Sequence, residues 1–164
     1  MNKLIGCILF TILTSVPVLA EQGMQDDGQL SSAQGAQLKA VIDSDADRLV
    51  GIFKDIHQNP ELGFMEERTS AIVARELDSL GYEVKTGIGK TGVVGVLKNG
   101  DGPVVMYRAD MDANAAEEKT GLPYASTRRV ENSDGVQVPV AHLCGHDAHV
   151  TWLLAVARVM AQMK

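Results

Sequence analysis

Residues that could do chemistry are concentrated between His142 and His149 of this 164-residue chain. These eight positions hold three of the four histidines together with Cys144 and Asp147. Cys144 and His146 are separated by one residue, so both side chains can turn toward one ion from a loop or a first helical turn. Thiolate and imidazole suit zinc, and also cobalt or nickel, with manganese less favoured. The spacing therefore predicts a metal site, in which His142 and His149 are further candidates and Asp147 could hold an imidazole N–H.

Other interpretations of this stretch stay open on spacing alone. A polar turn entering a helix could carry these residues without any ligand, because Cys and His also occur singly in protein cores. Cys144 could instead be a nucleophile activated by His146 or His149. Against this, the base of a Cys-His hydrolase usually lies far away in sequence, and a free thiolate is short-lived in an oxidising compartment. A closed structural zinc site usually needs several cysteines, so we expect an open site with a water.

A second group of candidate residues follows the apolar run Val104 to Tyr107. Asp110 and Asp112 come just after this run, which predicts a strand buried on both faces. In open α/β sheets, ligands bind beyond the carboxyl ends of the strands. We therefore expect these carboxylates to reach the junction that carries Cys144 and His146. A strand that ends in a solvated acidic turn is equally compatible with this pattern.

Helical and strand patterns alternate along the rest of the chain. Apolar residues at helical spacing predict helices over about 36–57, 66–80 and 148–163, the first stopped by Asn59-Pro60. Strand patterns cover 82–86, 93–98, 104–108 and 136–140. The turn residues 99–102 predict that 93–98 and 104–108 form an antiparallel hairpin. The expected fold class is α/β, with a mixed, mostly parallel sheet flanked by helices.

Two connections between these elements need separate interpretation. Gly89-Lys90-Thr91 is reminiscent of a phosphate-binding loop, but Val84 occupies the position of the required first glycine, and a strand rather than a helix follows. We therefore predict a glycine-rich turn between strands. Residues 111–137 predict a long irregular connection, and connections of that length are often functional.

The N-terminal end has the three-part layout of a secretory signal peptide over residues 1–20. Its apolar run, Leu4 to Val16, is too short for the roughly 20 residues that span a bilayer, so we expect no stable membrane anchor. Residues 21–35 predict a flexible leader, and residues 36–164 the domain. The expected location is the periplasm or the exterior of the cell.

Charge and cysteine content narrow the classes of partner. The chain has a net charge of −6, and loss of residues 1–20 would remove one lysine and no acid. Such an acidic chain is not built to bind nucleic acid. The same loss would remove Cys7, so Cys144 would have no intramolecular disulfide partner and would be buried, reactive or bound to metal.

Five segments, in this order and spacing, resemble one known family. They are Ile56-His57-Gln58-Asn59-Pro60-Glu61-Leu62, Gly89-Lys90-Thr91-Gly92-Val93-Val94, Arg108-Ala109-Asp110-Met111-Asp112-Ala113, Glu117-Glu118-Lys119-Thr120-Gly121-Leu122-Pro123-Tyr124-Ala125-Ser126 and Val138-Pro139-Val140-Ala141-His142-Leu143-Cys144-Gly145-His146-Asp147-Ala148-His149. The family is that of metal-dependent amidohydrolases, which includes hippurate hydrolase, N-acyl-amino-acid amidohydrolases and auxin-conjugate hydrolases. It is related to aminoacylase and zinc carboxypeptidase G. The resemblance runs from about Leu49 to Lys164.

The resemblance implies a specific site and reaction. Cys144 and His146 would be ligands of a centre of two divalent ions, with zinc as the first choice and manganese, cobalt or nickel as alternatives. Asp110 would be the active-site acid that helps to hold this centre. The reaction implied is hydrolysis of the amide bond of an N-acyl-amino acid or a small peptide by a water that the two ions activate. The fold implied is the N-terminal part of a zinc-exopeptidase catalytic domain.

The resemblance also implies that parts of the family's machinery lie elsewhere. The glutamate general base, further ligands and the lid or dimerisation domain that would form a homodimer follow the helix at 148–163 in the family. We therefore expect an N-terminal fragment that is inactive by itself; a non-catalytic or degenerate metal-binding module is the alternative. One local departure is Asn114-Ala115-Ala116, where the family usually has Leu-Pro, and loss of the proline predicts a looser turn beside Asp110.

Overall fold

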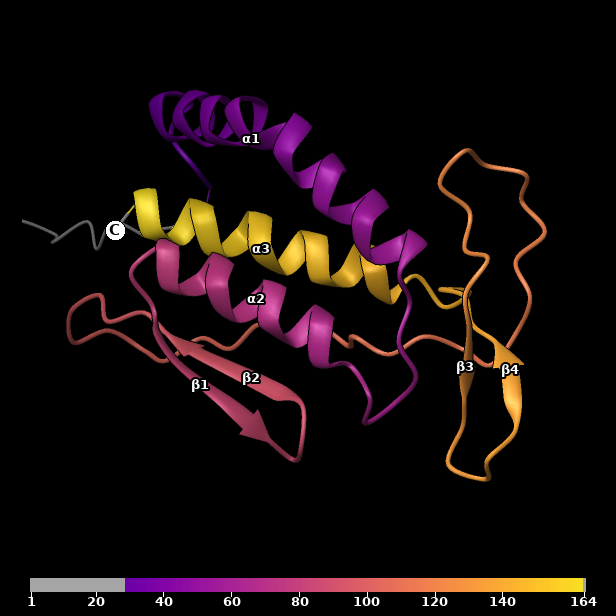
Figure 1. Ribbon diagram of the computed structural model, residues 1–164. Helices are drawn as coiled ribbons and strands as arrows, with labels where there is room; N and C mark the ends of the chain where they lie inside the picture. Colours follow the sequence, from indigo (N-terminus) through magenta and orange to yellow (C-terminus); the bar gives the residue numbers. More distant parts are fainter. Residues whose placement is uncertain (1–28, 164) are drawn as a thin grey trace, which may run out of the picture.

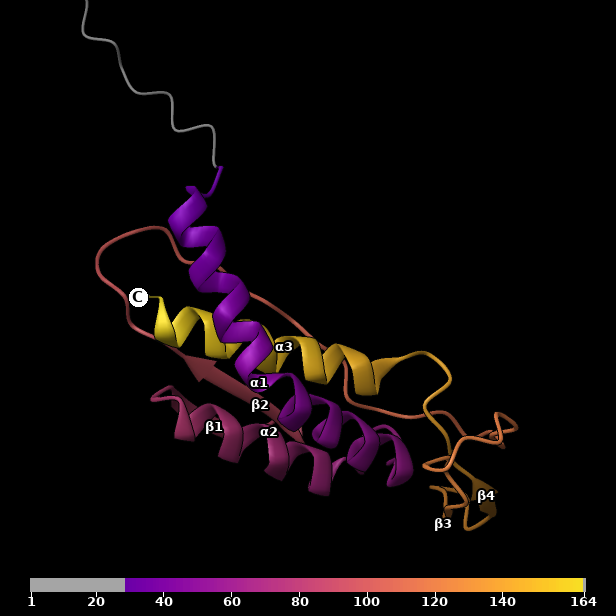
Figure 2. The same cartoon turned by 90° about the horizontal axis from the view of Figure 1, so that it is seen from above.

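The computed structural model describes residues 29–163, in which two helices are followed by two short hairpins and a third helix. The elements, in chain order, are α1 (Ser32–Gln58), α2 (Glu67–Ser79), β1 (Glu83–Ile88), β2 (Gly92–Val96), β3 (Arg129–Glu131), β4 (Gln137–Pro139) and α3 (His146–Gln162). In Figure 1, α3 lies between α1 and α2, and the β1–β2 hairpin packs beside α2. The β3–β4 hairpin lies beyond the N-terminal end of α3, so that end of the helix is where the connections converge (Figures 1 and 2).

The three predicted helices are confirmed, and local sequence signals explain their ends. α1 begins at Ser32, four residues earlier than predicted, because Ser31 and Gln34 form a capping box across the start of the helix. It ends before Asn59-Pro60, as expected. Ahead of α2, the carboxylate of Glu61 accepts hydrogen bonds from the backbone N–H groups of Arg68 and Thr69, which supplies the partners that the first turn lacks.

The hydrophobic core lies where the three helices meet. Its buried members are Leu49, Ile56, Ile72, Val73, Leu77, Val150, Leu154 and Ala157. Tyr82, at the entry to β1, packs against this core and donates a hydrogen bond from its hydroxyl to the carbonyl of Ala157 at 3.0 Å. The apolar stripes seen in the sequence therefore face one another, and removal of their surface from water is the main stabilising term.

A charged contact joins α1 to α3 at the edge of the core. The buried carboxylate of Asp45 accepts two hydrogen bonds from Arg48, at 2.6 and 2.7 Å, and lies 2.8 Å from Nε of Arg158. Hydrogen bonding from Arg48 outweighs burial and holds the pKa of Asp45 below its usual range. The ion pair between Asp45 and Arg158 therefore adds a polar contact to the otherwise apolar interface between α1 and α3.

The Gly-Lys-Thr segment is a turn between strands, as the sequence predicts. β1 and β2 are antiparallel, with Glu83 opposite Val96 and Lys85 opposite Val94. The hydroxyl of Thr91 donates to Glu66 at 2.6 Å, which ties the turn to the start of α2. No helix N-terminus follows this turn, so the phosphate-loop interpretation stays excluded.

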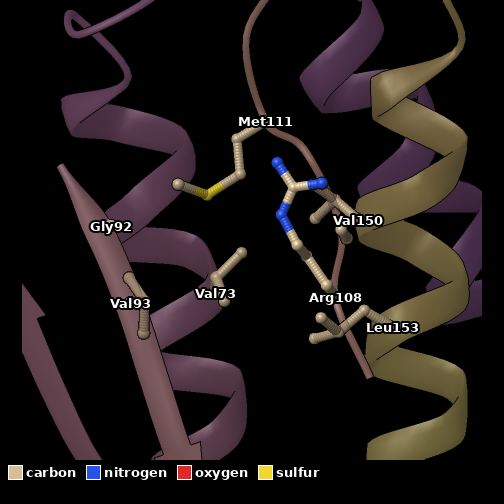
Figure 3. A pocket seen from close by; sticks show the side chains of 8 residues that line it. Val73, Gly92, Val93, Arg108, Met111, Val150 and Leu153 are labelled. Atoms are coloured by element: carbon tan, nitrogen blue, oxygen red, sulfur yellow. The ribbon is translucent and has the colours of Figure 1, made fainter. Parts of the chain in front are cut away.

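The strand predicted over residues 104–108, and its hairpin with 93–98, are wrong. β2 pairs with β1 instead, and Val104 and Met106 are 99% and 84% exposed where burial on both faces was predicted. Both hairpins are antiparallel, so the mostly parallel sheet is not found within residues 29–163. The physical reason is that this part of the chain offers no neighbouring strand to residues 104–108. Figure 3 shows a cavity between β2, α2 and α3, with Arg108 extending across it; its volume is about 200 Å³.

The remaining predictions concern the connections and the N-terminal end. The long connection contains β3, and the strand predicted over 136–140 is observed as β4, which pairs antiparallel with β3. From Gln29 to Met163, none of the helices combines the length and apolar character that crossing a bilayer requires. The predicted signal peptide and most of the predicted leader lie outside the described residues.

Candidate metal centre

His146, the first residue of α3, is oriented by Asp112. Its ring Nδ1 lies 2.8 Å from the backbone oxygen of Asp112 and 3.0 Å from the Oδ1 atom of the same residue. A carbonyl oxygen only accepts, so Nδ1 must carry the hydrogen, and in a neutral ring Nε2 then carries the lone pair. Ligating histidines are usually held in this way by their second nitrogen. The geometry therefore leaves Nε2 of His146 available as a metal ligand.

Cys144 lies two residues before this histidine, on the turn that leads into the helix. Its thiol is free and exposed. Between them, Gly145 has φ of +74°, a left-handed conformation that residues with a side chain rarely adopt. The glycine thus permits the sharp turn that places both residues at the N-terminal end of α3.

His142 is buried without a hydrogen-bond partner at either ring nitrogen. Burial is the largest influence on this ring and lowers the pKa of His142, so the neutral form of the ring is favoured. A buried N–H group without a partner is costly, which makes these nitrogens candidates for a ligand or a bound water. The orphaned ring is one observation in this stretch that favours a ligand site over a plain polar turn.

The two aspartates after the exposed run behave differently. Asp112 meets His146, whereas the carboxylate of Asp110 pairs with Arg108. Both aspartates line an open cleft of about 490 Å³ beside the turn that carries Gly89 and Thr91. Across residues 29–163, no group of three or more His, Cys, Asp or Glu side chains is arranged to hold a metal ion. The described donors therefore form part of a site rather than a closed cage.

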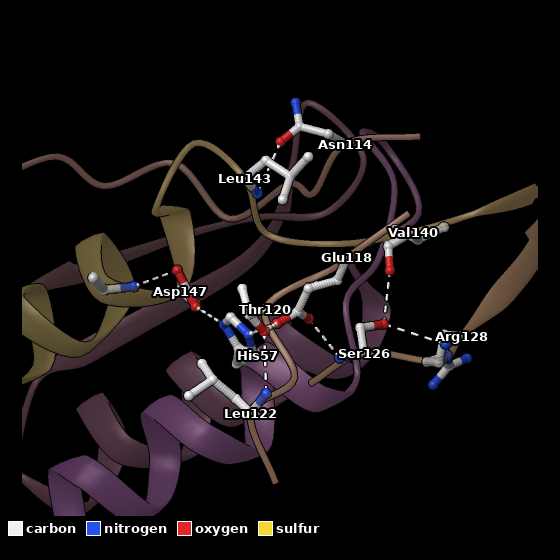
Figure 4. Close-up of polar contacts among 11 residues, drawn as sticks. His57, Asn114, Glu118, Thr120, Leu122, Ser126, Arg128, Val140, Leu143 and Asp147 are labelled. Atoms are coloured by element: carbon white, nitrogen blue, oxygen red, sulfur yellow. Dashed lines mark hydrogen bonds and ion pairs between the residues drawn. The ribbon is translucent and has the colours of Figure 1, made fainter. Parts of the chain in front are cut away.

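A buried polar network that the sequence did not predict lies directly behind this site. His57, at the end of α1, places Nδ1 2.6 Å from Oδ2 of Asp147 and Nε2 3.1 Å from Oε1 of Glu118. Both carboxylates are almost fully buried. Figure 4 shows the His57 ring between them. Asp147 thus holds an imidazole, as expected of it, but that of His57 rather than that of a predicted ligand.

The pKa values in this network move in opposite directions. Burial alone would lower the pKa of His57, but the hydrogen bonds with Asp147 and Glu118 outweigh it and raise the pKa above its usual value. Burial would raise the pKa of Glu118, but hydrogen bonds from Thr120, Ser126 and His57 outweigh it and lower that pKa. Both shifts favour an imidazolium that donates to two carboxylates.

Hydrogen bonds to a distant segment hold the turn after Asp112, where the sequence lacks the family's proline. The backbone N–H and C=O groups of Asn114 both pair with Ala141, at 2.9 and 3.0 Å. The side-chain oxygen of Asn114 also accepts from the N–H of Leu143 at 3.2 Å (Figure 4). The residue that departs from the family pattern therefore bonds to the segment that precedes Cys144.

Known proteins share this segment. No protein-family model matches the chain. The hippurate hydrolase of Campylobacter jejuni is 51% identical over 107 residues, which are 65% of this chain and 26% of that protein. The IAA-amino acid hydrolase ILR1-like 4 of Arabidopsis thaliana is 42% identical over 117 residues, which are 71% of this chain and 24% of that protein.

Solved structures agree with these relatives. The crystal structure of the Bacillus subtilis YXEP protein, described as a dinuclear metal-binding peptidase from the M20 family, superposes with a TM-score of 0.62 and 33% identity. The match covers 76% of this chain and 32% of that one, which confirms the expected fold as an incomplete counterpart of such a peptidase. The chain spans about a quarter to a third of the length of these relatives. As a segment of that extent, it belongs to the amidohydrolase and M20 peptidase family that includes hippurate hydrolase and the IAA-amino acid hydrolases.

Proposed function

We propose that this chain carries part of the metal-binding active site of an amidohydrolase that cleaves the amide bond of N-acyl-amino acids or small peptides. The observation that carries the proposal is the arrangement at the start of α3. Asp112 holds Nδ1 of His146, so Nε2 is free to bind a metal, and the exposed thiol of Cys144 lies two residues away. The names of the relatives support the reaction class, since they are a hippurate hydrolase and an IAA-amino acid hydrolase.

The side chains present could supply some, but not all, of the ligands of a divalent ion. Cys144 and His146 are the proposed ligands, and Asp110 is the proposed active-site acid next to Asp112. Thiolate and imidazole favour zinc, with cobalt, nickel or manganese as alternatives. When bound, such ions polarise the scissile carbonyl and activate water. The chain's own contribution is to fix the tautomer of His146 and to hold the first turn of α3 in place.

A two-metal centre needs more donors than the described residues bring together. We therefore propose that the remaining ligands and the general base come from residues outside this segment, and that the segment alone does not hydrolyse substrate. Export through residues 1–20 and a homodimer formed by a further domain are part of the same proposal. A non-catalytic metal-binding module is the second candidate, favoured by the same lack of a complete donor group.

Metal titration of the 164-residue chain tests the ligand assignment. We expect zinc or cobalt to bind weakly with one thiolate ligand, and Cys144→Ser to reduce the affinity far more than His57→Gln or His149→Ala does. A matched assay with hippurate and N-acetyl-amino acids should show no hydrolysis by the chain alone. Equal losses of affinity in all three variants would refute the ligand assignment, and strong hydrolysis by the chain alone would refute the partial site.

A further inference from the structure

The buried network around His57 reaches both sides of the segment that carries the proposed ligands. On one side, Asp147 directly follows His146, and its second carboxylate oxygen accepts from the N–H of Ala148 at 2.9 Å. This bond lies within the first turn of α3. A change in the position of Asp147 must therefore move the backbone that carries His146.

On the other side, the network continues through Glu118. Its second oxygen accepts from the N–H of Ser126 at 2.6 Å, and the hydroxyl of Ser126 donates to the carbonyl of Val140 at 2.7 Å. Val140 is fully buried and lies two residues before His142. Figure 4 shows this continuous path from Asp147 through His57 and Glu118 to Val140. The segment 142–146, hereafter the ligand loop, is therefore fixed at both ends by one set of hydrogen bonds.

His57 is the link on which both halves depend. Its two ring nitrogens point in different directions, and each meets one buried carboxylate. The ring is itself held in place by edge contact with Tyr124, at 5.3 Å between centroids, and by Phe53 at 5.6 Å. Without the imidazole, two carboxylates that are almost out of contact with water would face each other with fewer donors, and buried charges without partners force rearrangement.

We infer that His57 is a positioning residue: it bridges Asp147 and Glu118 and thereby fixes both ends of the ligand loop that carries Cys144 and His146. The effect on the loop stands on the contacts alone, and the effect on metal affinity rests on the proposed function. His57 touches neither the proposed ligands nor the cleft beside Asp110. Its role is therefore to hold the ligand loop in a conformation suited to binding.

Amide hydrogen exchange of the metal-free chain tests the first part. His57→Ala and the milder His57→Gln should accelerate exchange in residues 140–148 more than in α2. Ile56→Ala is the matched control, since Ile56 is the fully buried neighbour on α1 and has no side-chain polar group. It should loosen the helical core without this preference for 140–148. Glu118→Gln should reproduce the pattern of His57→Gln, because it weakens the same link.

Zinc titration of the same variants tests the second part. Loss of a group that directly contacts a metal ligand weakens binding about 10- to 100-fold; His57 acts one contact further away, so His57→Gln should weaken zinc binding by up to about 10-fold while Ile56→Ala stays near wild type. At saturating cobalt, His57→Gln should still show the thiolate-to-metal charge-transfer band, because Cys144 remains. Equal acceleration of exchange in the His57 and Ile56 variants would overturn the inference. A wild-type chain that binds no metal would refute the proposed function, and the exchange pattern would still decide the role of His57.

Discussion

Two regions that both contribute to the proposed site differ in how fully this chain supports them. The end of α1, the start of α3 and the segment around Glu118 hold each other through buried contacts, and His57 has partners at both ring nitrogens. Residues 104–107 are apolar but exposed, with no strand beside them in the described part. The difference shows that an apolar run is buried only where a neighbouring element is present to cover it. We propose that in a protein as long as the relatives such an element covers this run.

The largest contrast should appear in stability. Leu154 is fully buried between the helices, so Leu154→Ala should lower the free energy of unfolding by about 2–5 kcal/mol. Met106→Ala should change it by less than about 0.5 kcal/mol, because Met106 is exposed. Urea unfolding followed by circular dichroism measures both values. Comparable losses would show that residues 104–108 are packed in solution, and the contrast between the regions would fail.

A smaller loss should follow from weakening the buried network. Glu118→Gln keeps the shape of the side chain but removes its charge, so it should lower the free energy of unfolding by about 1.5–3 kcal/mol, the range for hydrogen bonds to charged groups. Glu117→Gln is the matched control, because Glu117 is exposed and its contact with Lys119 is on the surface. Equal effects of the two substitutions in urea unfolding would contradict the burial of the network.

The network should also make stability depend on pH. The raised pKa of His57 means that its contribution is fully present below its usual value of 6.5 and is lost as pH rises through the folded-state pKa. Between pH 6.5 and 9, the lowered pKa of Glu118 keeps it ionised and the lowered pKa of His142 keeps it neutral, whereas the raised pKa of His57 places its loss of charge in this interval. The stability difference between wild type and His57→Gln should therefore shrink over this interval. Urea midpoints at several pH values measure it, and a constant difference would mean that His57 is not charged in the folded chain.

The weakest expected effect concerns association of the chain. Val105 is 81% exposed within an apolar run, and such runs promote pairing between chains. Val105→Lys should reduce concentration-dependent association in light scattering while it leaves the free energy of unfolding within about 0.5 kcal/mol of wild type. Ile42→Lys, an exposed apolar position on α1, is the control and should have less influence. No difference between the two variants would show that residues 104–108 do not drive association.

Local patterns explain why much of the fold was predictable. The helices have an apolar period, the first of them has a clear stop at Asn59-Pro60, and the turn around Gly89 has glycines in the left-handed conformation that such a turn needs. The absence of a strand at 104–108 was not predictable in the same sense, because strand pairing depends on elements that the local sequence does not describe. The turn residues 99–102 predicted a hairpin between 93–98 and 104–108, but β2 pairs with β1 instead.

The sequence indicated candidate residues where they lie close together along the chain, and it missed the contacts that join distant residues. The spacing of Cys144 and His146 predicted ligands, and this assignment stays a prediction. The sequence did not predict that Asp112 is the partner of His146 and that Asp110 pairs with Arg108. His57 and Glu118 are separated by 61 residues, and no period or spacing links them. The one available signal was that both lie in segments that resemble the family.

The most direct test of the account is a chimera of the Campylobacter jejuni hippurate hydrolase in which the 107 matched residues are replaced by those of this chain. If this segment supplies one part of an amidohydrolase metal centre, the chimera should hydrolyse hippurate. Cys144→Ser in the chimera should then lower the rate by more than the roughly 100-fold that loss of an outer partner causes. A folded, metal-loaded chimera without hydrolysis, or one whose activity survives Cys144→Ser, would contradict the account.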